Sequence, residues 1–217
     1  MQNLQSLQTV RGLGVSSVTR NLIAGSTSSR VAAGTDDNFY RQNSGGTPTL
    51  SNNANDVMAG IFDANQTACG SQMRFLNLTV PQGAIITSAS ILINSDNGNA
   101  LNTVNSKLRG VASDNAAISV TTGGGLGSFE NPPFTTAVVL WDSIAAWANN
   151  DQITTPSIVT IIQEIVNRPG WASGNAMVIS WDDLDKRSTQ SDNVIRTGTS
   201  YNNTPASAPL LTINYLA

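Results

Sequence analysis

The chain has 217 residues, of which 12% are charged and 40% are hydrophobic. This length suits one well-cored domain, and a low charged share with abundant Asn, Ser, Thr and Gly is typical of turn-rich β proteins. The net charge of −3 argues against sequence-independent nucleic-acid binding, which needs a basic face. The absence of histidine and the single cysteine exclude histidine-dependent triads, histidine-ligated zinc and a disulfide framework.

The first 35 residues differ from the rest of the chain. Residues 1–35 have weak hydrophobic periodicity, so we expect an extended arm, with the folded domain spanning residues 36–217. The arm contains Arg11, Arg20 and Arg30 and no acidic residue, which leaves a net charge of −6 on the remainder. A basic arm on an acidic body predicts docking on an acidic partner, and a short solvated tail explains the composition equally well.

The N-terminus lacks the basic start and apolar run of a signal peptide, and no apolar stretch approaches the ~20 residues that span a bilayer. We therefore expect a protein that is made in the cytoplasm and has no membrane partner.

From about residue 57, short apolar runs recur between clusters of Gly, Asn and Pro. Several such runs predict an antiparallel β-sandwich. The expected strands are Val57–Phe62, Met73–Val80, Ile85–Ile93, Lys107–Ala112, Thr135–Trp141, Ala176–Trp181, Val194–Thr199 and Leu210–Tyr215.

One segment, at about residues 155–168, has the start and stop signals of an α-helix instead. Thr155 is a candidate N-cap, Pro156 suits the first helical position, and Pro169-Gly170 ends the segment. An apolar stripe at helical spacing consists of Ile158, Ile161, Ile162 and Ile165. We expect this helix to cover one end or edge of the sandwich.

Carboxylates are the remaining candidates for chemistry. The only glutamates are Glu130 and Glu164, and Glu164 is expected on the solvent side of the helix, so we expect no enzyme. Asp182, Asp183 and Asp185 follow a strand and are weak calcium candidates, because calcium takes oxygen ligands from loops. Turn capping is the simpler explanation of these aspartates.

Four tryptophans are candidates either for the core or for sugar stacking. Trp141 and Trp181 end apolar strands and Trp171 follows the helix, so a core position is favoured for these three. Trp147 lies in the segment Ala145–Asn150 and is expected to be the most exposed. We therefore predict Trp147 as the first glycan contact, if the chain binds sugar.

From about Asp36 to Tyr215, the chain resembles jelly-roll domains of bacterial surface proteins and phage structural proteins, which are similar to carbohydrate-binding modules. The matching segments are Arg74-Phe75, Val80–Ala89, Ala112–Ala116, Val139–Trp141, Thr155–Ala176 and Ala208–Tyr215. The resemblance implies the fold and brings no catalytic residues.

A stand-alone domain with an arm further resembles phage capsid decoration, or cement, proteins. This resemblance implies a virion location, a homotrimer, and binding to the major capsid protein or another virion protein through Arg11, Arg20 and Arg30. The alternatives are a carbohydrate-binding module and a tail or head fibre protein that attaches to host glycans. Neither resemblance implies a cofactor.

Overall fold

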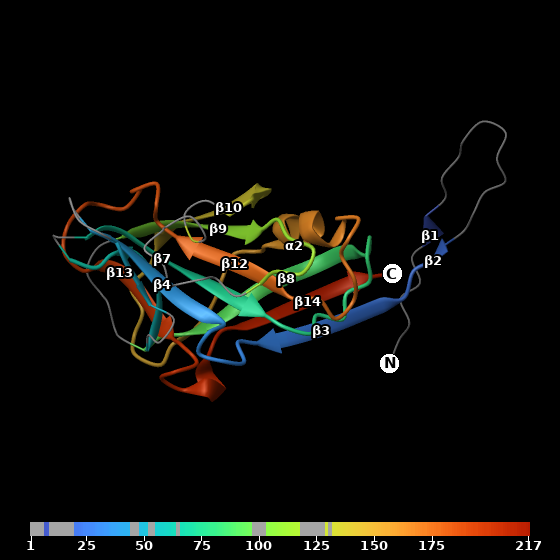
Figure 1. The fold of residues 1–217 in the computed structure, drawn as a ribbon, viewed down its shortest axis with the longest axis horizontal. Coiled ribbons are helices and arrows are strands. Elements are labelled where there is room, and N and C mark those ends of the chain that lie inside the picture. The colour runs from blue at the N-terminus through green and yellow to red at the C-terminus, as the bar shows by residue number, and fades with distance from the viewer. Residues whose placement is uncertain are drawn as a thin grey trace.

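The computed structural model describes residues 7–8, 20–43, 48–51, 55–63, 66–96, 103–117, 129 and 132–217. These residues form two packed antiparallel β-sheets and one α-helix, as the sequence predicts (Figure 1). The helix is labelled α2, and a separate two-stranded pair lies beyond one end of the sandwich, beside the C-terminus.

The smaller sheet has four strands in the order β11-β8-β14-β3. Its strands are β3 (Ala24–Arg30), β8 (Ile85–Asn94), β11 (Gln152–Thr154) and β14 (Leu210–Leu216). Residues that alternate along β8 and β14 are buried, including Ile91, Ile93 and Leu211. The pairing of β14 with β8 shifts register between Asn214 and Tyr215. At this irregularity two successive β8 residues, Thr87 and Ser88, are both exposed, and the alternation of buried and exposed residues continues on either side.

The larger sheet runs in the order β10-β9-β12-β7-β4-β5, with β6 paired to both β7 and β13. Its strands are β4 (Asp37–Asn43), β5 (Thr49–Ser51), β6 (Asp56–Ile61), β7 (Gln66–Phe75), β9 (Val104–Val111), β10 (Phe134–Ile144), β12 (Met177–Asp182) and β13 (Val194–Thr199). Every residue of β12 and β13 is buried, including their polar side chains. These polar groups therefore need hydrogen-bond partners within the protein.

The strand order is that of a jelly roll. The chain passes from β3 in the small sheet to β7 in the large one, then to β8, to β9 and β10, to β11, to β12 and finally to β14. This alternation produces two facing four-strand sets, β11-β8-β14-β3 and β10-β9-β12-β7. Strands β4, β5, β6 and β13 extend the large sheet beyond this arrangement.

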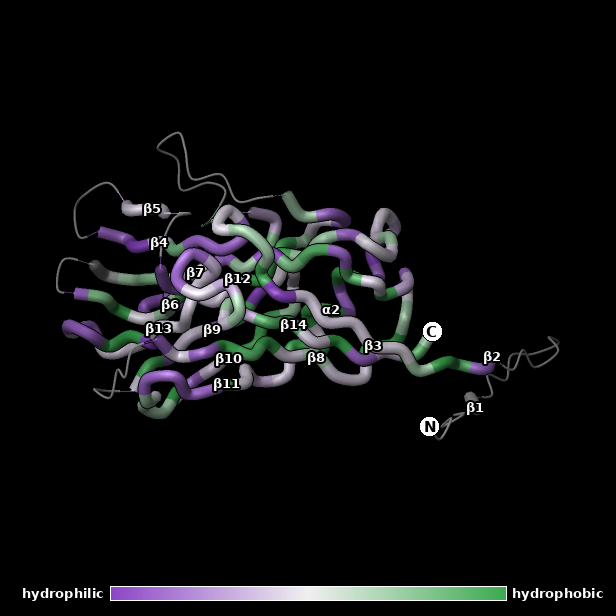
Figure 2. The backbone as a smooth tube through the Cα atoms, turned by 90° about the horizontal axis from the view of Figure 1, so that it is seen from below, coloured by the Kyte–Doolittle hydropathy of each residue, from purple (hydrophilic) through white to green (hydrophobic). Residues whose placement is uncertain are grey.

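Hydrophobic segments gather in the middle of the sandwich, whereas the end near β4, β6 and β13 is more hydrophilic (Figure 2). The core lies between the sheets and includes Phe75 and Leu108 from the large sheet and Ile91 from the small one.

Helix α2 (Val159–Val166) packs on β8, β9 and β10. The predicted apolar stripe is confirmed, because Ile158, Ile161, Ile162 and Ile165 are all 0% exposed. The helix also covers an edge, as expected: Ile158 N donates to Ala89 O of β8 at 2.9 Å. The Gln163 side chain accepts from Ile86 N of β8 at 2.9 Å and donates to Ala84 O, just before β8, at 2.8 Å.

The predicted start of the helix is wrong by one turn. Ile158 occupies the N-cap position, where no side chain caps the helix. The Thr155 hydroxyl instead accepts a hydrogen bond from Ile91 N of β8, at 3.0 Å. Thr155 therefore extends the pairing of the sheet edge, and Pro156 lies before the helix rather than in its first turn.

The predicted arm is too long. Residues 24–30 form β3, which pairs with β14 from Ala24↔Leu216 to Arg30↔Leu210, and Val31 is 1% exposed. The sequence hides this strand because its residues are mostly Ser, Thr and Gly, and only Thr27 of the strand is buried. The sandwich therefore begins at Ala24.

The residues before β3 that the structure describes are β1 (Leu7–Gln8) and β2 (Arg20–Asn21), which pair with each other, and the short connection to β3. Within the described part of the chain, no helix has the length and apolar character needed to span a membrane.

Candidate functional site

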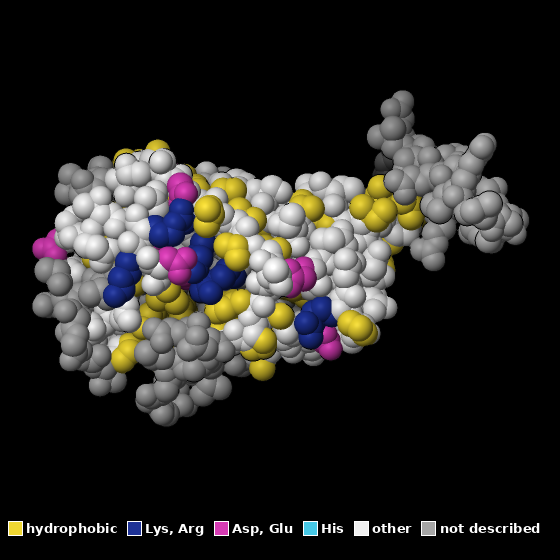
Figure 3. Space-filling model, turned by 90° about the horizontal axis from the view of Figure 1, so that it is seen from above, with side chains coloured by type: hydrophobic (Ala, Val, Ile, Leu, Met, Phe, Trp, Pro, Cys, Tyr) yellow, Lys and Arg dark blue, Asp and Glu magenta, His cyan; other side chains and the backbone are white. Residues whose placement is uncertain are grey.

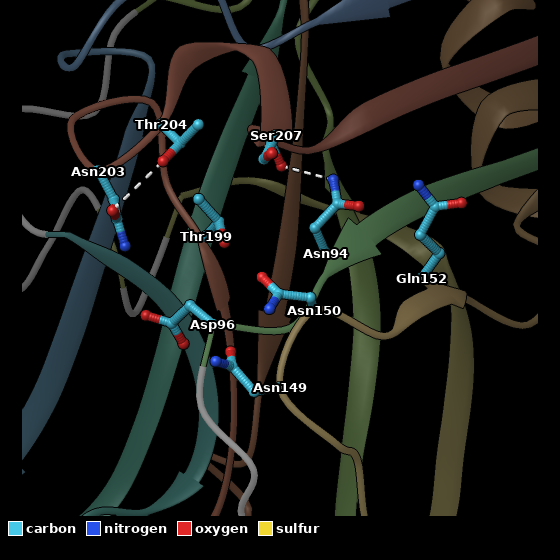
Figure 4. Close-up of a pocket in the computed structure, with 9 residues that line it drawn as sticks. All are labelled: Asn94, Asp96, Asn149, Asn150, Gln152, Thr199, Asn203, Thr204 and Ser207. Atoms are coloured by element: carbon cyan, nitrogen blue, oxygen red, sulfur yellow. Dashed lines mark hydrogen bonds between the residues drawn. The ribbon is translucent and has the colours of Figure 1, made fainter.

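A polar pocket of about 480 Å³ opens where the loops at one end of β8, β11 and β13 meet (Figure 4). It is lined by Asn94, Asp96, Asn149, Asn150, Gln152, Thr199, Asn203, Thr204 and Ser207. These residues come from the end of β8, the β10–β11 loop, the end of β13, and the segment leading into the short 3₁₀ helix η1 (Pro205–Ser207). Residues distant in sequence therefore surround one space.

One wall of the pocket is a tight turn before β11. Asn150 N donates to Ser95 O and Ser95 N donates to Asp151 O, both at 2.8 Å. The Asp151 carboxylate accepts from Ala148 N at 2.6 Å, which closes the turn on itself. Asn150 adopts a φ of 67°, a left-handed conformation that asparagine tolerates better than most residues. The backbone thus fixes the Asn149-Asn150 pair.

The opposite wall is the η1 turn. Ser207 N donates to Thr204 O at 2.9 Å, and Thr204 N donates to Ser200 O at 3.2 Å. The Asn94 side chain joins the end of β8 to the η1 wall, because its Nδ2 donates to Ser207 O at 2.7 Å (Figure 4).

The chemistry of the lining is neutral and hydrogen-bonding. Five residues carry carboxamides and three carry hydroxyls, so all but one of the lining side chains can both donate and accept. Asp96 is the only acidic or basic residue among them, its Oδ1 is buried without a hydrogen-bond partner among the described residues, and it lies beside Asp56 of β6. Burial, together with this neighbouring carboxyl, raises the pKa of Asp56 to about 7.

Trp147 is not exposed, so the predicted glycan contact is wrong. Its side chain is 5% exposed and lies 5.9 Å, centroid to centroid, from both Trp141 and Trp181. Arg196 donates to the carbonyls of Ile144 and Ala145, both at 2.8 Å, and so holds the segment that carries Trp147 over the core. Local sequence could not reveal this contact, because Arg196 is about 50 residues away.

The core interpretation of the other tryptophans is consistent with the structure. Trp181 is fully buried and its Nε1 donates to Ser106 Oγ at 2.9 Å. Trp171 is 3% exposed and donates to Val80 O at 2.9 Å, and Trp141 is partly buried against the same core. The indole N–H groups of Trp171 and Trp181 thus each reach an acceptor inside the core.

Asp182 is held by bases rather than arranged for calcium. Its carboxylate is fully buried and accepts from Arg109 Nη2 at 2.8 Å and Ser180 Oγ at 2.9 Å, with Lys107 Nζ at 4.0 Å. Lys107 also pairs with the half-exposed Asp185 at 2.5 Å. This cluster of Asp182, Asp185, Lys107 and Arg109 is called the buried ion network below.

Asp183 caps a turn instead of joining Asp182 in a site. Its two oxygens accept from Arg187 N at 2.7 Å and Ser188 N at 3.1 Å, and burial raises its pKa. No group of three metal-ligating side chains exists among the described residues. Asp182, Asp183 and Asp185 therefore do not converge on one point in the described structure, so calcium binding by them stays a prediction, and the turn-capping alternative holds for Asp183.

The three arginines of the predicted arm have different positions. Arg30 is part of β3, and its Nη1 donates to Ala208 O, so this side chain is used within the fold rather than presented to a partner. Arg11 and the side chain of Arg20 lie outside the described residues. The prediction that all three form a docking arm is wrong for Arg30.

Glu164 is half-buried rather than free on the solvent side of the helix. Its carboxylate accepts from Thr136 N at 2.7 Å and from Ala137 N at 2.8 Å, which attaches the helix to β10. Glu130 lies outside the described residues.

In the space-filling view, basic and acidic side chains lie next to one another rather than forming a field of one sign (Figure 3). The ion pairs agree with this distribution, since Arg74, Arg168 and Arg187 each contact an aspartate.

The pocket residues were not predicted from the sequence. The signal was present as the Asn149-Asn150 and Asn202-Asn203 pairs, which indicate turns but not that two turns will face each other. No protein-family model and no curated protein sequence matches this chain.

Proposed function

We propose that this chain is a non-catalytic virion structural protein of a phage, which binds the assembled capsid as a decoration protein. The fold is compatible with this role, because jelly rolls are common in viral capsid proteins as well as in lectins. That support is an analogy at the level of fold, and the specific argument rests on the N-terminal segment.

The observation that carries the proposal is where the chain leaves the sandwich. Ile23 exchanges backbone hydrogen bonds with Ala217, at 2.8 and 3.0 Å, and its side chain is 74% exposed. Strands β1 and β2 lie beyond this point, outside the sandwich (Figures 1 and 2). An exposed isoleucine at the base of a projecting segment suits contact with another molecule.

The charges suit an acidic partner surface. With Arg30 used inside β3, Arg11 and Arg20 remain the bases that the segment before the sandwich offers. We infer that they contact the major capsid protein or a neighbouring virion protein. A protein that binds only the assembled shell shifts the assembly equilibrium toward that shell, which is how decoration stabilises a capsid.

A homotrimer around a capsid symmetry axis is the proposed oligomer, and attachment to a tail or head fibre is a variant of the same role. The glycan-binding alternative through Trp147 is not retained, because that ring is buried.

The test is to grow phage particles with and without this chain. We expect particles with the chain to show it on the shell by electron microscopy and to survive heating better than particles without it. A variant with Arg11→Ala and Arg20→Ala should co-sediment more weakly with shells that lack the chain. An Arg168→Ala variant is the control, because Arg168 pairs with Asp114 within the sandwich.

Light scattering measures the oligomer, and a trimer has three times the 22.7 kDa mass of one chain. Particles that never contain the chain would contradict the proposed function, whatever the solution mass.

A further inference from the structure

Strand β10 forms an open edge of the large sheet. It pairs with β9 on one side, and no described strand lies beyond it in the sheet (Figure 1). Helix α2 protects the first part of this edge, where the Glu164 carboxylate accepts from Thr136 N and Ala137 N. From Val138 to Asp142, no described residue other than those of β9 bonds the backbone of β10.

The hydrogen bonds of β9 show which of its residues turn toward β10. Asn105 N and O both bond the Ser188 hydroxyl, on the β12 side of β9, at 2.9 and 3.0 Å. Gly110 N instead donates to the Thr135 hydroxyl, on the β10 side, at 3.1 Å. Because successive residues of an antiparallel strand bond to opposite sides, Leu108 also turns its backbone groups toward β10.

The outward-facing residues of β10 follow from this alternation. Val139 lies opposite Leu108, so its N–H and C=O groups are used within the sheet. Val138, Leu140 and Asp142 therefore direct their N–H and C=O groups away from β9. This stretch is a row of backbone donors and acceptors that the described fold leaves unpaired.

The side chains along this row do not protect it. Val138 is 44% exposed and Leu140 is 57% exposed, whereas natural edge strands usually carry a lysine, a proline or a cover that prevents pairing. Asp142 is the only charged residue of the stretch, and Arg187 neutralises it. Ser143, with a φ of 52°, ends the regular strand. The open edge is thus short, flat and apolar.

We propose that the Val138–Asp142 edge pairs antiparallel with the same edge of a second copy of this chain, across a twofold axis at Leu140. In this register Leu140 faces Leu140 of the second copy, and Val138 faces Asp142. Each outward N–H then meets an outward C=O. No like charges face each other, since each Asp142 lies opposite a valine and keeps its own Arg187.

Self-pairing is favoured because the other described edges are short or covered. Strands β5 and β11 have three residues each, and every residue of β13 is buried. Strand β3 is approached by the segment after β7, whose Leu76 N and Thr79 N donate to the hydroxyls of Ser29 and Thr27. An unrelated strand would meet no charge on the β10 edge that could select it, whereas a second copy presents the same length and pattern.

Single cysteines in the full chain test the register. Leu140→Cys should join chains in pairs under mild oxidation, because facing α-carbons in this register lie about 5.5 Å apart, within the ~4.4–6.8 Å that a disulfide spans. Val138→Cys alone should not link, but a mixture of Val138→Cys and Asp142→Cys should. Electrophoresis without reductant measures the product, and the native Cys69 is buried and should not contribute.

The matched control is Ile85→Cys, at a 43% exposed apolar position of the small sheet. Leu140→Cys should link at least about tenfold faster than this control, because pairing raises the local concentration of the two thiols.

Hydrogen exchange of the unmodified chain tests the pairing without a cysteine. The amides of Val138 and Leu140 should exchange more slowly at high than at low protein concentration, because pairing withdraws them from water. Leu140→Lys should abolish this concentration dependence at Val138, since two lysines would then face each other. Ile85→Lys should retain it.

The proposal is overturned if Leu140→Cys links no faster than Ile85→Cys, or if Val138→Cys alone links as fast as Leu140→Cys. It is also overturned if a synthetic peptide of residues 1–19 slows the exchange of Val138 and Leu140 in dilute chain, because the N-terminal segment would then be the occupant.

This twofold contact is separate from the proposed trimer and does not rest on the proposed function. Capsid attachment is assigned to residues before Ala24, so Leu140→Lys should bind shells as the unmodified chain does. Conversely, the variant with Arg11→Ala and Arg20→Ala should keep the concentration-dependent exchange at Val138. Failure of one proposal is therefore distinguishable from failure of the other.

Discussion

The buried ion network and the polar pocket are both rich in polar side chains, yet they use those side chains differently. In the ion network, Asp182 is fully buried and is satisfied by Arg109 and Ser180 of the same sheet. In the pocket, Asn149, Asn150 and Gln152 are exposed and extend into a space that no described residue fills.

The comparison shows that polarity alone does not mark a functional site. Aspartates following a strand resemble metal ligands in sequence, but here the neighbouring strand supplies Lys107 and Arg109 as their partners. Asparagines in turns resemble ordinary loop residues, but here two turns converge. The criterion that separates the regions is whether the fold itself satisfies the polar groups.

The largest expected effect comes from breaking the buried ion network. Asp182→Asn should lower the free energy of unfolding by about 3–5 kcal/mol, because it leaves the guanidinium of Arg109 without its buried counter-charge. Urea unfolding followed by tryptophan fluorescence measures this loss. The matched control is Asp185→Asn, whose side chain is 52% exposed and should cost less than about 1 kcal/mol. Equal losses in both variants would contradict the assignment of Asp182 as the centre of the network.

A smaller effect, dependent on pH, is expected beside the pocket. The pKa of Asp56 is raised from 3.8 to about 7, so folding favours its protonated form. Its stabilising contribution is complete below pH 3.8 and is lost as the pH rises through about 7. Burial raises the pKa of Asp37 to about 6, with the same sign.

Asp56→Asn should therefore reduce the difference in unfolding free energy between pH ~5 and pH ~8 by about 1 kcal/mol, after allowance for solvent screening. Urea titrations at the two pH values measure it. Asp192→Asn, at an exposed position, is the control and should leave the difference unchanged. A steeper pH dependence in Asp56→Asn would show that the sign is wrong.

The smallest effect is expected inside the pocket. Gln152→Ala should change the free energy of unfolding by less than about 0.5 kcal/mol, because its carboxamide stabilises nothing within the described fold. Gln82→Ala should cost slightly more, since it removes the hydrogen bond from Gln82 Nε2 to Arg168 O, at 3.0 Å. Thermal unfolding of the two variants measures the order. A large loss of stability in Gln152→Ala would show that this side chain stabilises the fold. It would then contradict the distinction between the satisfied polar groups of the ion network and the unsatisfied groups of the pocket.

Local patterns were enough to predict much of the fold. The runs that became β8, β13 and β14 were found nearly to the residue, because short strand-forming runs bounded by turn clusters are properties of adjacent residues. The stripe of isoleucines predicted α2 and its covering role for the same reason. Strand β3 was missed because a Ser-rich edge strand has almost no apolar alternation to detect.

The candidate site could not be predicted in this way. Trp147 appeared exposed because its neighbours in sequence are alanines and asparagines, whereas contacts with distant residues, among them the rings of Trp141 and Trp181, bury it. Thr155 has the sequence position of a helix cap, yet its hydroxyl accepts a hydrogen bond from the backbone of the adjacent strand β8 instead.

The sequence by itself therefore determined the class of fold, the position of the helix and the excess of uncharged polar residues. The tertiary structure decided which of those polar residues are satisfied: it paired Asp182 with bases and brought the turns at Asn149 and Asn203 around one pocket. The physical reason is that hydrogen-bond satisfaction depends on partners that the jelly-roll crossings bring together from distant parts of the chain.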